Sequence, residues 1–387
     1  MHEIAQAPIP STGRILIADD QPHILDALQM LLKGSGFSTE VITQPSRVLQ
    51  ALETSVFDAV LMDLNYSRNS TSGEEGLELV SQIRAMDKVL PVLVMTAWGS
   101  VDLAVQAMRR GASDFVEKPW ENRELLAKLS HQMRRAEEQR RAQRQTDEEL
   151  AEARVIQQSL LPKHLPEIAG FEVAGVTQPL RFVGGDYYNV VRISPLHTAL
   201  CIADVAGKGL PAALLMSSLQ AALRPLLSQR LAPRELCQRL NRILCELTPM
   251  GKFISFFYAV LDSAENRLTY CNAGHNPPLL VRADGASMEL DAAGAVLGQF
   301  PSWGYEQSEL RLEPGDRLLI FTDGLVEACN ANDQAFGESR VVRIARESPG
   351  VNARDLMDLT MRAASAHCGG HFQDDASLIV LKRKRRG

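Results

Sequence analysis

Four short acidic motifs are distributed over the second half of the chain, each where an apolar run meets a Gly or polar turn. They are Gly184-Gly185-Asp186, Asp204 through Gly209, Thr322-Asp323-Gly324 and Asp374-Asp375. The apolar runs predict strands, so the carboxylates are expected at strand ends. Converging carboxylates repel one another unless cations hold them together, and Mg²⁺ and Mn²⁺ prefer such oxygen ligands. Two such ions close together form a site for attack of water on a phosphate ester.

The first half carries a different set of polar residues, each directly after an apolar run of strand length. The set comprises Asp19, Asp20, Asp63, Thr96 and Lys118. Segments of helical periodicity separate the runs, and this alternation predicts a doubly wound parallel α/β sheet that binds ligands at the C-terminal ends of its strands. The expected strands are 15–18, 56–62, 92–95 and 114–116. One chain therefore combines two phosphate chemistries, which indicates a regulated phosphatase.

Length and composition limit the class of protein. A chain of 387 residues is too long for one ordinary core, and its 45% hydrophobic and 23% charged residues are typical of soluble globular domains. The formal net charge of -6 argues against nucleic-acid binding. No membrane span or signal peptide is expected, because no apolar run approaches the required length. The six cysteines form no close pairs, which favours reduced thiols and a cytoplasmic location.

The pattern divides the chain into three parts, expected at residues 13–125, 126–160 and 161–384. The middle part belongs to a run from Glu121 to Leu161 without Gly or Pro. Apolar residues at spacings of three and four mark both ends of this run, whereas residues 137–149 are almost wholly polar. Such a helix is weakly held alone, so pairing with a second copy as a coiled-coil homodimer is predicted. A solvated spacer helix is the alternative.

The third part predicts a sandwich of α+β class with its helices outside. Strands are expected at 198–203, 256–261, 266–272, 317–321 and 377–381, the second and third forming a hairpin. Long helices are expected at 211–228 and 233–247, each opened by a proline in its first turn. Strand meanders with inserted helices are typical of this class.

The first part resembles the receiver domain of bacterial two-component response regulators, a flavodoxin-like fold. The resemblance implies that Asp63 accepts a phosphoryl group from a sensor histidine kinase. It implies a Mg²⁺ site made by Asp20, Asp63 and the Asn65 carbonyl, with Asp19 assisting. The switch residues implied are Thr96, Phe115 and Lys118. The loop at residues 65–75 is longer than in many receivers, and the alternative is a receiver that only mediates contacts.

The third part resembles the metal-dependent protein phosphatases of the 2C family, in the SpoIIE/RsbU-like branch. Besides the acidic motifs, the matching segments are Ile156 to Pro162, Ala273 to Pro278 and Pro314-Gly315-Asp316. The resemblance implies two Mn²⁺ or Mg²⁺ ions. One ion takes Asp186 and the Val205 carbonyl, the other takes Asp323 and Asp374, and Asp204 bridges them. Asp375 is the alternative to Asp374.

Together the resemblances imply a response regulator whose output is a protein serine/threonine phosphatase. The implied substrate is a phosphorylated anti-sigma-factor antagonist of the STAS type, within a partner-switching pathway. A non-catalytic adaptor that binds a regulator in a receiver-dependent way is the alternative. Adaptors of that kind lose metal-binding aspartates, so the retained set Asp186, Asp204, Asp323 and Asp374 favours the enzyme.

Overall fold

The computed structural model describes residues 13–66, 73–97, 101–291 and 294–385. It divides into two compact units, residues 1–147 and 148–387. Most of the long polar loop expected after Asp63 lies outside the described residues. Each unit is described by itself below.

The first unit is built on a five-stranded parallel sheet in the order β2-β1-β3-β4-β5. Its strands are β1 (Arg14–Ala18), β2 (Ser38–Ile42), β3 (Ala59–Asp63), β4 (Val92–Ala97) and β5 (Asp114–Lys118). Helices α1 (Pro22–Gly34), α2 (Ser46–Thr54), α3 (Glu74–Met86) and α4 (Val101–Arg109) connect them. The predicted doubly wound α/β fold is confirmed.

The central strands are buried on both faces, which explains their continuous apolar sequences. Residues 15–18 and 59–62 are fully covered by helices. The third strand begins at Ala59 rather than at the expected Val56, which is 82% exposed. Asp58 sets this start, because it exchanges two hydrogen bonds with Arg14 at the beginning of β1.

The run without Gly or Pro forms one helix, α5 (Asn122–Leu160), of 39 residues. Its first turns belong to the first unit, since Leu125, Leu129 and Met133 pack into the core on one face of the parallel sheet. The expected boundary at residue 125 therefore falls inside this helix. From Glu137 onward most side chains are exposed, as the polar sequence requires.

The second unit contains two five-stranded antiparallel sheets, in the orders β13-β10-β9-β8-β7 and β12-β11-β14-β15-β6. The strands of the first sheet are β7 (Tyr187–Arg192), β8 (His197–Val205), β9 (Ile254–Asp262), β10 (Arg267–Ala273) and β13 (Ser308–Arg311). Those of the second are β6 (Phe171–Gln178), β11 (Leu279–Val281), β12 (Ser287–Glu289), β14 (Arg317–Phe321) and β15 (Ala376–Arg383). The expected hairpin is present as β9 and β10.

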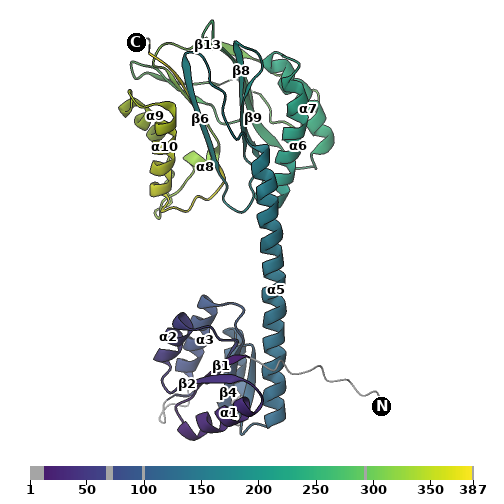
Figure 1. The fold of residues 1–387 in the computed structure, drawn as a ribbon, viewed down its shortest axis with the longest axis vertical. Coiled ribbons are helices and arrows are strands. Elements are labelled where there is room, and N and C mark those ends of the chain that lie inside the picture. The colour runs from purple at the N-terminus through teal and green to yellow at the C-terminus, as the bar shows by residue number, and fades with distance from the viewer. Residues whose placement is uncertain (1–12, 67–72, 98–100, 292–293, 386–387) are drawn as a thin grey trace. The chain divides into compact units, whose positions relative to one another are not determined.

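Helices cover the outer faces of both sheets (Figure 1). One core lies between the sheets and includes Ile202, Phe257 and Ile379. On one outer face α6 (Leu210–Leu227) and α7 (Pro233–Leu247) pack over a second core. On the other face lie α8 (Asp323–Val326), α9 (Glu338–Glu347) and α10 (Ala353–His367). The predicted α+β sandwich with external helices is confirmed.

Helices α9 and α10 were not anticipated from sequence. Helix α9 buries only Val341 and Ala345, so its apolar pattern is sparse. Helix α10 has a clear start, since Asn352 accepts a hydrogen bond from the Asp355 backbone N–H at 2.9 Å. That capping arrangement is the local feature that predicts a helix at this position.

Helix α6 meets, by length and composition, the requirement for crossing a membrane. Half of its length is buried in this domain. Met216, Leu219 and Leu223 pack into the core that α6 and α7 form over the sheet. Its apolar character therefore has a role within the sandwich.

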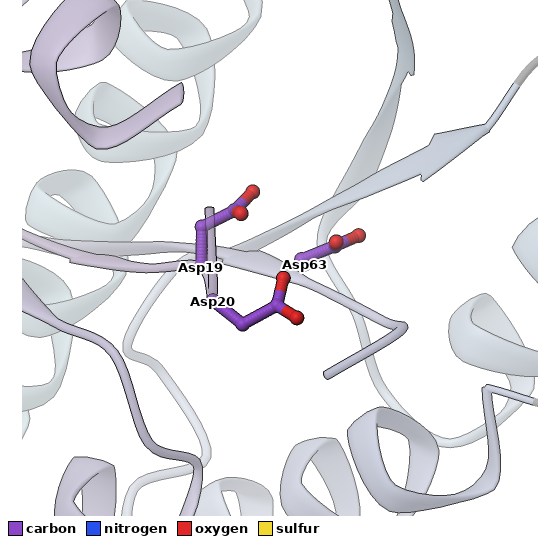
Figure 2. Close-up of side chains that lie close together, drawn as sticks. All are labelled: Asp19, Asp20 and Asp63. Carbon is purple, nitrogen blue, oxygen red and sulfur yellow. The ribbon is translucent and has the colours of Figure 1, made fainter. Parts of the chain in front are cut away.

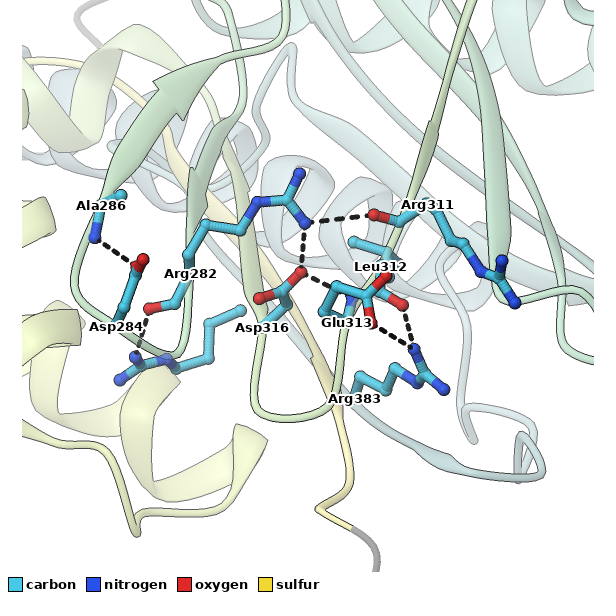
Figure 3. A network of polar contacts seen from close by, with 9 residues as sticks. Arg282, Asp284, Ala286, Arg311, Leu312, Glu313, Asp316 and Arg383 are labelled. Atoms are coloured by element: carbon cyan, nitrogen blue, oxygen red, sulfur yellow. Dashed lines mark hydrogen bonds and ion pairs between the residues drawn. The ribbon is translucent and has the colours of Figure 1, made fainter.

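The Pro314-Gly315-Asp316 motif fixes the turn between β13 and β14 (Figure 3). The buried Asp316 carboxylate accepts hydrogen bonds from the Glu313 N–H at 2.7 Å and from Arg282 at 2.5 Å. Arg282 also donates to the Arg311 carbonyl at 3.1 Å. This motif therefore orders the end of the sandwich at which β14 begins.

Candidate functional site

In the first unit, the strand register brings the expected residues to one edge of the sheet. Ala18 pairs with Met62, so Asp19 and Asp63 follow from neighbouring strands. Asp63 pairs with Met95, which places Thr96 one residue farther along the next strand. Lys118 ends β5. Parallel strands carry these residues to the same rim because their carboxyl ends coincide.

Three carboxylates meet at this rim, and Figure 2 shows them side by side. Asp19, Asp20 and Asp63 each offer an oxygen, and these oxygens lie within 4.8 Å of one another. The Lys118 ammonium contacts Asp19 at 2.7 Å and Asp63 at 2.9 Å. A single ammonium thus compensates two buried negative charges, which would otherwise be costly.

Asp63 is only 4% exposed, and its surroundings shift the pKa of its carboxyl group. Burial raises the pKa of the Asp63 carboxyl and the nearby Asp19 raises it further, while Lys118 opposes both effects. An additional positive charge at the rim would favour the ionised carboxylate.

The rim fits a hard cation such as Mg²⁺. Two buried oxygens, Asp20 Oδ1 and Asn65 Oδ1, have no hydrogen-bond partner among the described residues. Together with the three clustered carboxylates they form an oxygen-rich donor set of the kind that Mg²⁺ takes. The receiver resemblance implies the main-chain carbonyl of Asn65 as a ligand, whereas the side-chain oxygen is the one without a hydrogen-bond partner in the part of the chain that the structure describes.

The other two switch candidates lie on β4 and β5. Thr96 is buried. Phe115 is half-buried, and Lys128 of α5 lies 5.0 Å from its ring centroid and donates to its carbonyl at 2.8 Å. A residue of the long helix therefore touches the aromatic residue that the receiver resemblance marks as a switch.

In the second unit, Asp186 stands at the start of β7 and is 5% exposed. Its Oδ2 accepts hydrogen bonds from the Thr322 hydroxyl at 2.7 Å and the Ser377 hydroxyl at 2.6 Å. Its Oδ1 is buried without a partner among the described residues. Thr322, directly after β14, and Ser377 in β15 thus hold one oxygen and leave the second oxygen available.

Asp204 lies near the end of β8, beside Asp186. Burial raises the pKa of Asp204 to about 7, and the negative charges of Asp323, Asp374 and Asp375 add to this effect. Burial likewise raises the pKa of Asp186 well above its usual range, with Asp204 contributing. These carboxylates bring more negative charge together than the fold neutralises with its own cations.

Asp323 and Asp374 come from the other sheet, at the ends that follow β14 and precede β15. Burial raises the pKa of Asp323, and Asp374 adds to the rise. The Asp374 carboxylate contacts the Lys208 ammonium at 2.7 Å. Gly324 lets the two segments approach, because a Cβ atom there would lie 2.0 Å from the Asp375 carbonyl oxygen.

The adjacent aspartates 374 and 375 have different surroundings. The buried Asp375 accepts the Leu180 N–H at 2.7 Å with one oxygen and the Gly185 N–H at 2.6 Å with the other. Both of its oxygens are therefore engaged with backbone donors. Asp374 is half-buried and accepts one backbone N–H, that of Asp375 at 2.8 Å.

Several residues that support the acidic centre are not predicted from the sequence. Thr322 and Ser377 both donate hydrogen bonds to Asp186. Thr322 could have been found from the sequence, because it belongs to the Thr322-Asp323-Gly324 motif, whereas Ser377 belongs to none of the motifs. His275, within the segment Ala273 to Pro278, is another supporting residue. It lies 2.8 Å from the Ser255 hydroxyl and 3.1 Å from the Phe321 carbonyl, and burial lowers its pKa to about 4.

The acidic centre of the second unit fits divalent cations. In this centre, Asp186 has a buried oxygen without a partner within the described ranges, several carboxylates converge, and the Val205 main chain lies close to the Gly-Gly turn. Its carboxylates are spaced more widely than the receiver triad, which is the tight acidic group found among the described residues. Oxygen donors of this type suit Mg²⁺ and Mn²⁺.

Comparisons with known proteins find a matching family for each half of the chain. The response regulator receiver domain family matches residues 15–130, and the stage II sporulation protein E (SpoIIE) family matches residues 194–384. The fold and the site thus define a phosphatase domain joined to a receiver domain.

The chain is 30% identical to the phosphoserine phosphatase RsbU of Bacillus subtilis over 243 residues, which cover 62% of this chain and 72% of RsbU. It is 36% identical over 125 residues to the transcriptional regulatory protein FixJ of Bradyrhizobium diazoefficiens, covering 32% of this chain and 58% of FixJ. A crystal structure of the RsbU and RsbW domains of a Mycobacterium tuberculosis protein is 25% identical, with a TM-score of 0.51, covering 59% of this chain and 64% of that one. The chain belongs to the SpoIIE/RsbU family of serine/threonine phosphatases and carries a receiver domain.

Proposed function

We propose that this protein removes phosphate from phosphoserine or phosphothreonine on a protein substrate and that phosphorylation of Asp63 controls the reaction. The observation that carries the phosphatase assignment is the arrangement of Asp186. One of its oxygens is held by Thr322 and Ser377. The other is buried next to Asp204 and has no hydrogen-bond partner among the residues that the structure describes. A buried carboxylate oxygen without a donor is costly unless a cation contacts it.

The residues proposed to hold two Mn²⁺ or Mg²⁺ ions are Asp186, Asp204, the Val205 carbonyl, Asp323 and Asp374. When bound, the ions would activate water and neutralise charge on the phosphoryl oxygens. Asp186 and Asp204 contribute preorganised oxygens, while Asp375 fixes the backbone of the Gly-Gly turn. Engagement of both Asp375 oxygens supports Asp374 as the ligand of the adjacent pair.

The proposed receiver chemistry centres on Asp63 as nucleophile toward a phosphoryl group. Lys118 neutralises developing charge from 2.9 Å, and Mg²⁺ would be held by Asp19, Asp20, Asp63 and Asn65. Thr96 and Phe115 are the proposed switch. Phosphorylation adds negative charge beside Lys118, which weakens its hold on Asp19 and changes the packing of the rim.

The proposed partners follow from the two halves. A sensor histidine kinase would supply the phosphoryl group that the receiver accepts at Asp63. A phosphorylated STAS-type anti-sigma-factor antagonist would be the substrate of the phosphatase in a cytoplasmic partner-switching pathway. RsbU bears the name phosphoserine phosphatase, which supports this substrate class. We further propose domain limits at 13–125, 126–160 and 161–384, with homodimerisation through the exposed part of α5.

Hydrolysis of a phosphoserine peptide by the purified full chain with Mn²⁺ tests the phosphatase assignment. The parent should release phosphate, and Asp204→Asn should lower the rate by several orders of magnitude. The matched control is Asp284→Asn, an exposed aspartate whose hydrogen bond to the Ala286 N–H at 2.9 Å an Asn can keep. Comparable rates for Asp204→Asn and the parent at saturating Mn²⁺ would refute the assignment.

A second assay addresses control and substrate. The rate toward a purified, serine-phosphorylated STAS-domain protein is measured before and after treatment of the full chain with acetyl phosphate and Mg²⁺. A change in rate that disappears in Asp63→Asn supports control through this residue. An equal change in Asp63→Asn would show that control does not pass through it.

A further inference from the structure

The last turns of α5 contact the acidic centre of the second unit through one side chain. Gln157 donates from Nε2 to the Gly184 carbonyl at 2.7 Å and accepts the Gly184 N–H with Oε1 at 3.1 Å. The side-chain amide of Gln157 thus satisfies both the backbone N–H and the backbone carbonyl of Gly184. A paired contact of this kind fixes orientation as well as distance, because the two bonds must align together.

Gly184 is two residues before Asp186, in a turn with no room for a side chain. A Cβ atom at Gly184 would lie 2.5 Å from Asp375 Oδ2, and the same oxygen accepts the Gly185 N–H at 2.6 Å. The Gly-Gly turn is therefore held from one side by Asp375 and through its own backbone by Gln157. The connection from α5 to the Asp186 carboxylate therefore runs through the Gln157 side chain and then through the backbone of residues 184–186.

The same residues border a cleft of about 250 Å³ beside the acidic centre. Gln157, Gly184, Asp186 and Asp375 all contribute to its lining. The next residue, Gln158, also borders the cleft, but it is exposed, whereas Gln157 is half-buried and hydrogen-bonded to Gly184. The difference between two adjacent glutamines shows that the hydrogen-bonded position depends on the rotation of α5 about its axis.

We propose that Gln157 is a positioning residue for the metal centre: it fixes the Gly184–Asp186 turn so that Asp186 presents its free oxygen to a divalent cation. This inference rests on the proposed function of Asp186 as a metal ligand. In this role Gln157 is not itself a ligand and acts through the backbone of Gly184. A rotation or shift of α5 that withdraws Gln157 loosens the turn and weakens metal binding without altering any ligand.

Binding of Mn²⁺ tests this inference directly. Calorimetric titrations of the full chain are made in an Asp20→Asn background, which removes one carboxylate from the receiver cluster so that the phosphatase centre dominates the signal. In this background Gln157→Ala should bind Mn²⁺ about tenfold more weakly, the lower end of the effect of losing a supporting contact around a metal site. Gln158→Ala is the matched control and should bind Mn²⁺ as the background protein does.

Gln157→Glu separates the two hydrogen bonds, since it keeps an acceptor for the Gly184 N–H and loses the donor to the Gly184 carbonyl. Its Mn²⁺ affinity should also fall, while circular dichroism and thermal unfolding stay close to those of Gln158→Ala. In phosphoserine-peptide hydrolysis, both Gln157 variants should need about tenfold more Mn²⁺ for half-maximal rate and approach the control kcat when Mn²⁺ saturates.

Three results would overturn the proposal. Mn²⁺ affinity of both Gln157 variants within twofold of the control would do so, as would a lower kcat with unchanged Mn²⁺ affinity. A parent protein that neither binds Mn²⁺ at this centre nor hydrolyses the peptide would overturn the proposed function, and this inference with it. The first two results leave the phosphatase assignment intact, so the two failures are distinguishable.

Discussion

Replacing Asp204 with Asn should stabilise the second unit in the presence of a chelator, even though it abolishes hydrolysis. Burial raises the pKa of Asp204 from 3.8 to about 7, and the negative charges of Asp323, Asp374 and Asp375 add to this effect. At pH 8 in EDTA the folded protein must keep this carboxylate ionised against its neighbours. Asn has nearly the same shape and carries no charge, so the substitution removes that repulsion.

The magnitude follows from the pKa difference. Between 3.8 and about 7 there are about three pH units, each equivalent to about 1.4 kcal/mol, which gives an upper bound of about 4 kcal/mol. The charge of Asp204 also raises the pKa of Asp186, so part of this free energy belongs to the pair and about 2 kcal/mol is the expected gain. For a domain of this size, about 1 kcal/mol raises the melting temperature by roughly 2–4 °C, so we expect a rise of about 4–8 °C.

The pH dependence has a definite sign. Between about pH 4 and pH 7 the folded protein keeps a proton on Asp204 that the unfolded chain has lost. Unfolding therefore releases a proton, and stability falls as the pH rises through this window. In the Asp204→Asn protein, stability should fall less between about pH 4 and pH 7 than in the parent, because Asn does not titrate. Excess Mn²⁺ should reverse the order of stability, because bound cations favour the folded parent and not the variant.

Scanning calorimetry of the full chain in EDTA at pH 5, 6, 7 and 8 measures the effect. The transition of the receiver serves as an internal reference that the substitution should leave in place. Asp284→Asn controls for the loss of an exposed charge in the same domain. An Asp204→Asn protein that melts at or below the parent temperature at pH 8, with the same pH dependence, would refute the proposed carboxylate repulsion.

Three further predictions concern other parts of the chain. Asp63→Asn should abolish labelling by acetyl phosphate with Mg²⁺, whose product in the parent is acid-stable and base-labile; labelling that persists would place the acceptor elsewhere, with Asp20 the next candidate. Ala142→Pro should disrupt α5, since an interior proline costs about 3 kcal/mol, and should uncouple phosphatase rate from Asp63 phosphorylation; a full response in this variant would mean that the signal bypasses the helix. Gly324→Ala should destabilise the phosphatase domain by a few kcal/mol in urea unfolding, because its Cβ would lie 2.0 Å from the Asp375 carbonyl oxygen; unchanged stability would show that the two segments separate easily.

Much of the fold could be predicted from the sequence, because burial of a strand and continuity of a helix leave their mark on consecutive residues. Buried parallel strands are continuously apolar, so β1 and β4 were evident, as was the end of each strand at a polar residue. The absence of Gly and Pro from Glu121 to Leu161 predicted one helix, and the structure has it as α5. Helix α9 was missed because a short amphipathic segment among turns gives little periodic signal. Helix α10 has 15 residues, and its local signal is the Asn352 cap at its start.

The sequence by itself determined which aspartates are candidates, since each stands where a strand meets a turn. Only the tertiary structure decided how they differ. Asp374 and Asp375 are neighbours in the chain, yet the second accepts backbone hydrogen bonds from Leu180 and Gly185, nearly 200 residues away. The hold of Thr322 and Ser377 on Asp186 and the contact of Gln157 with Gly184 also join distant segments. Spacing along a chain fixes the face and end of an element on which a side chain lies, but its partners depend on how the two sheets pack, which no local pattern encodes.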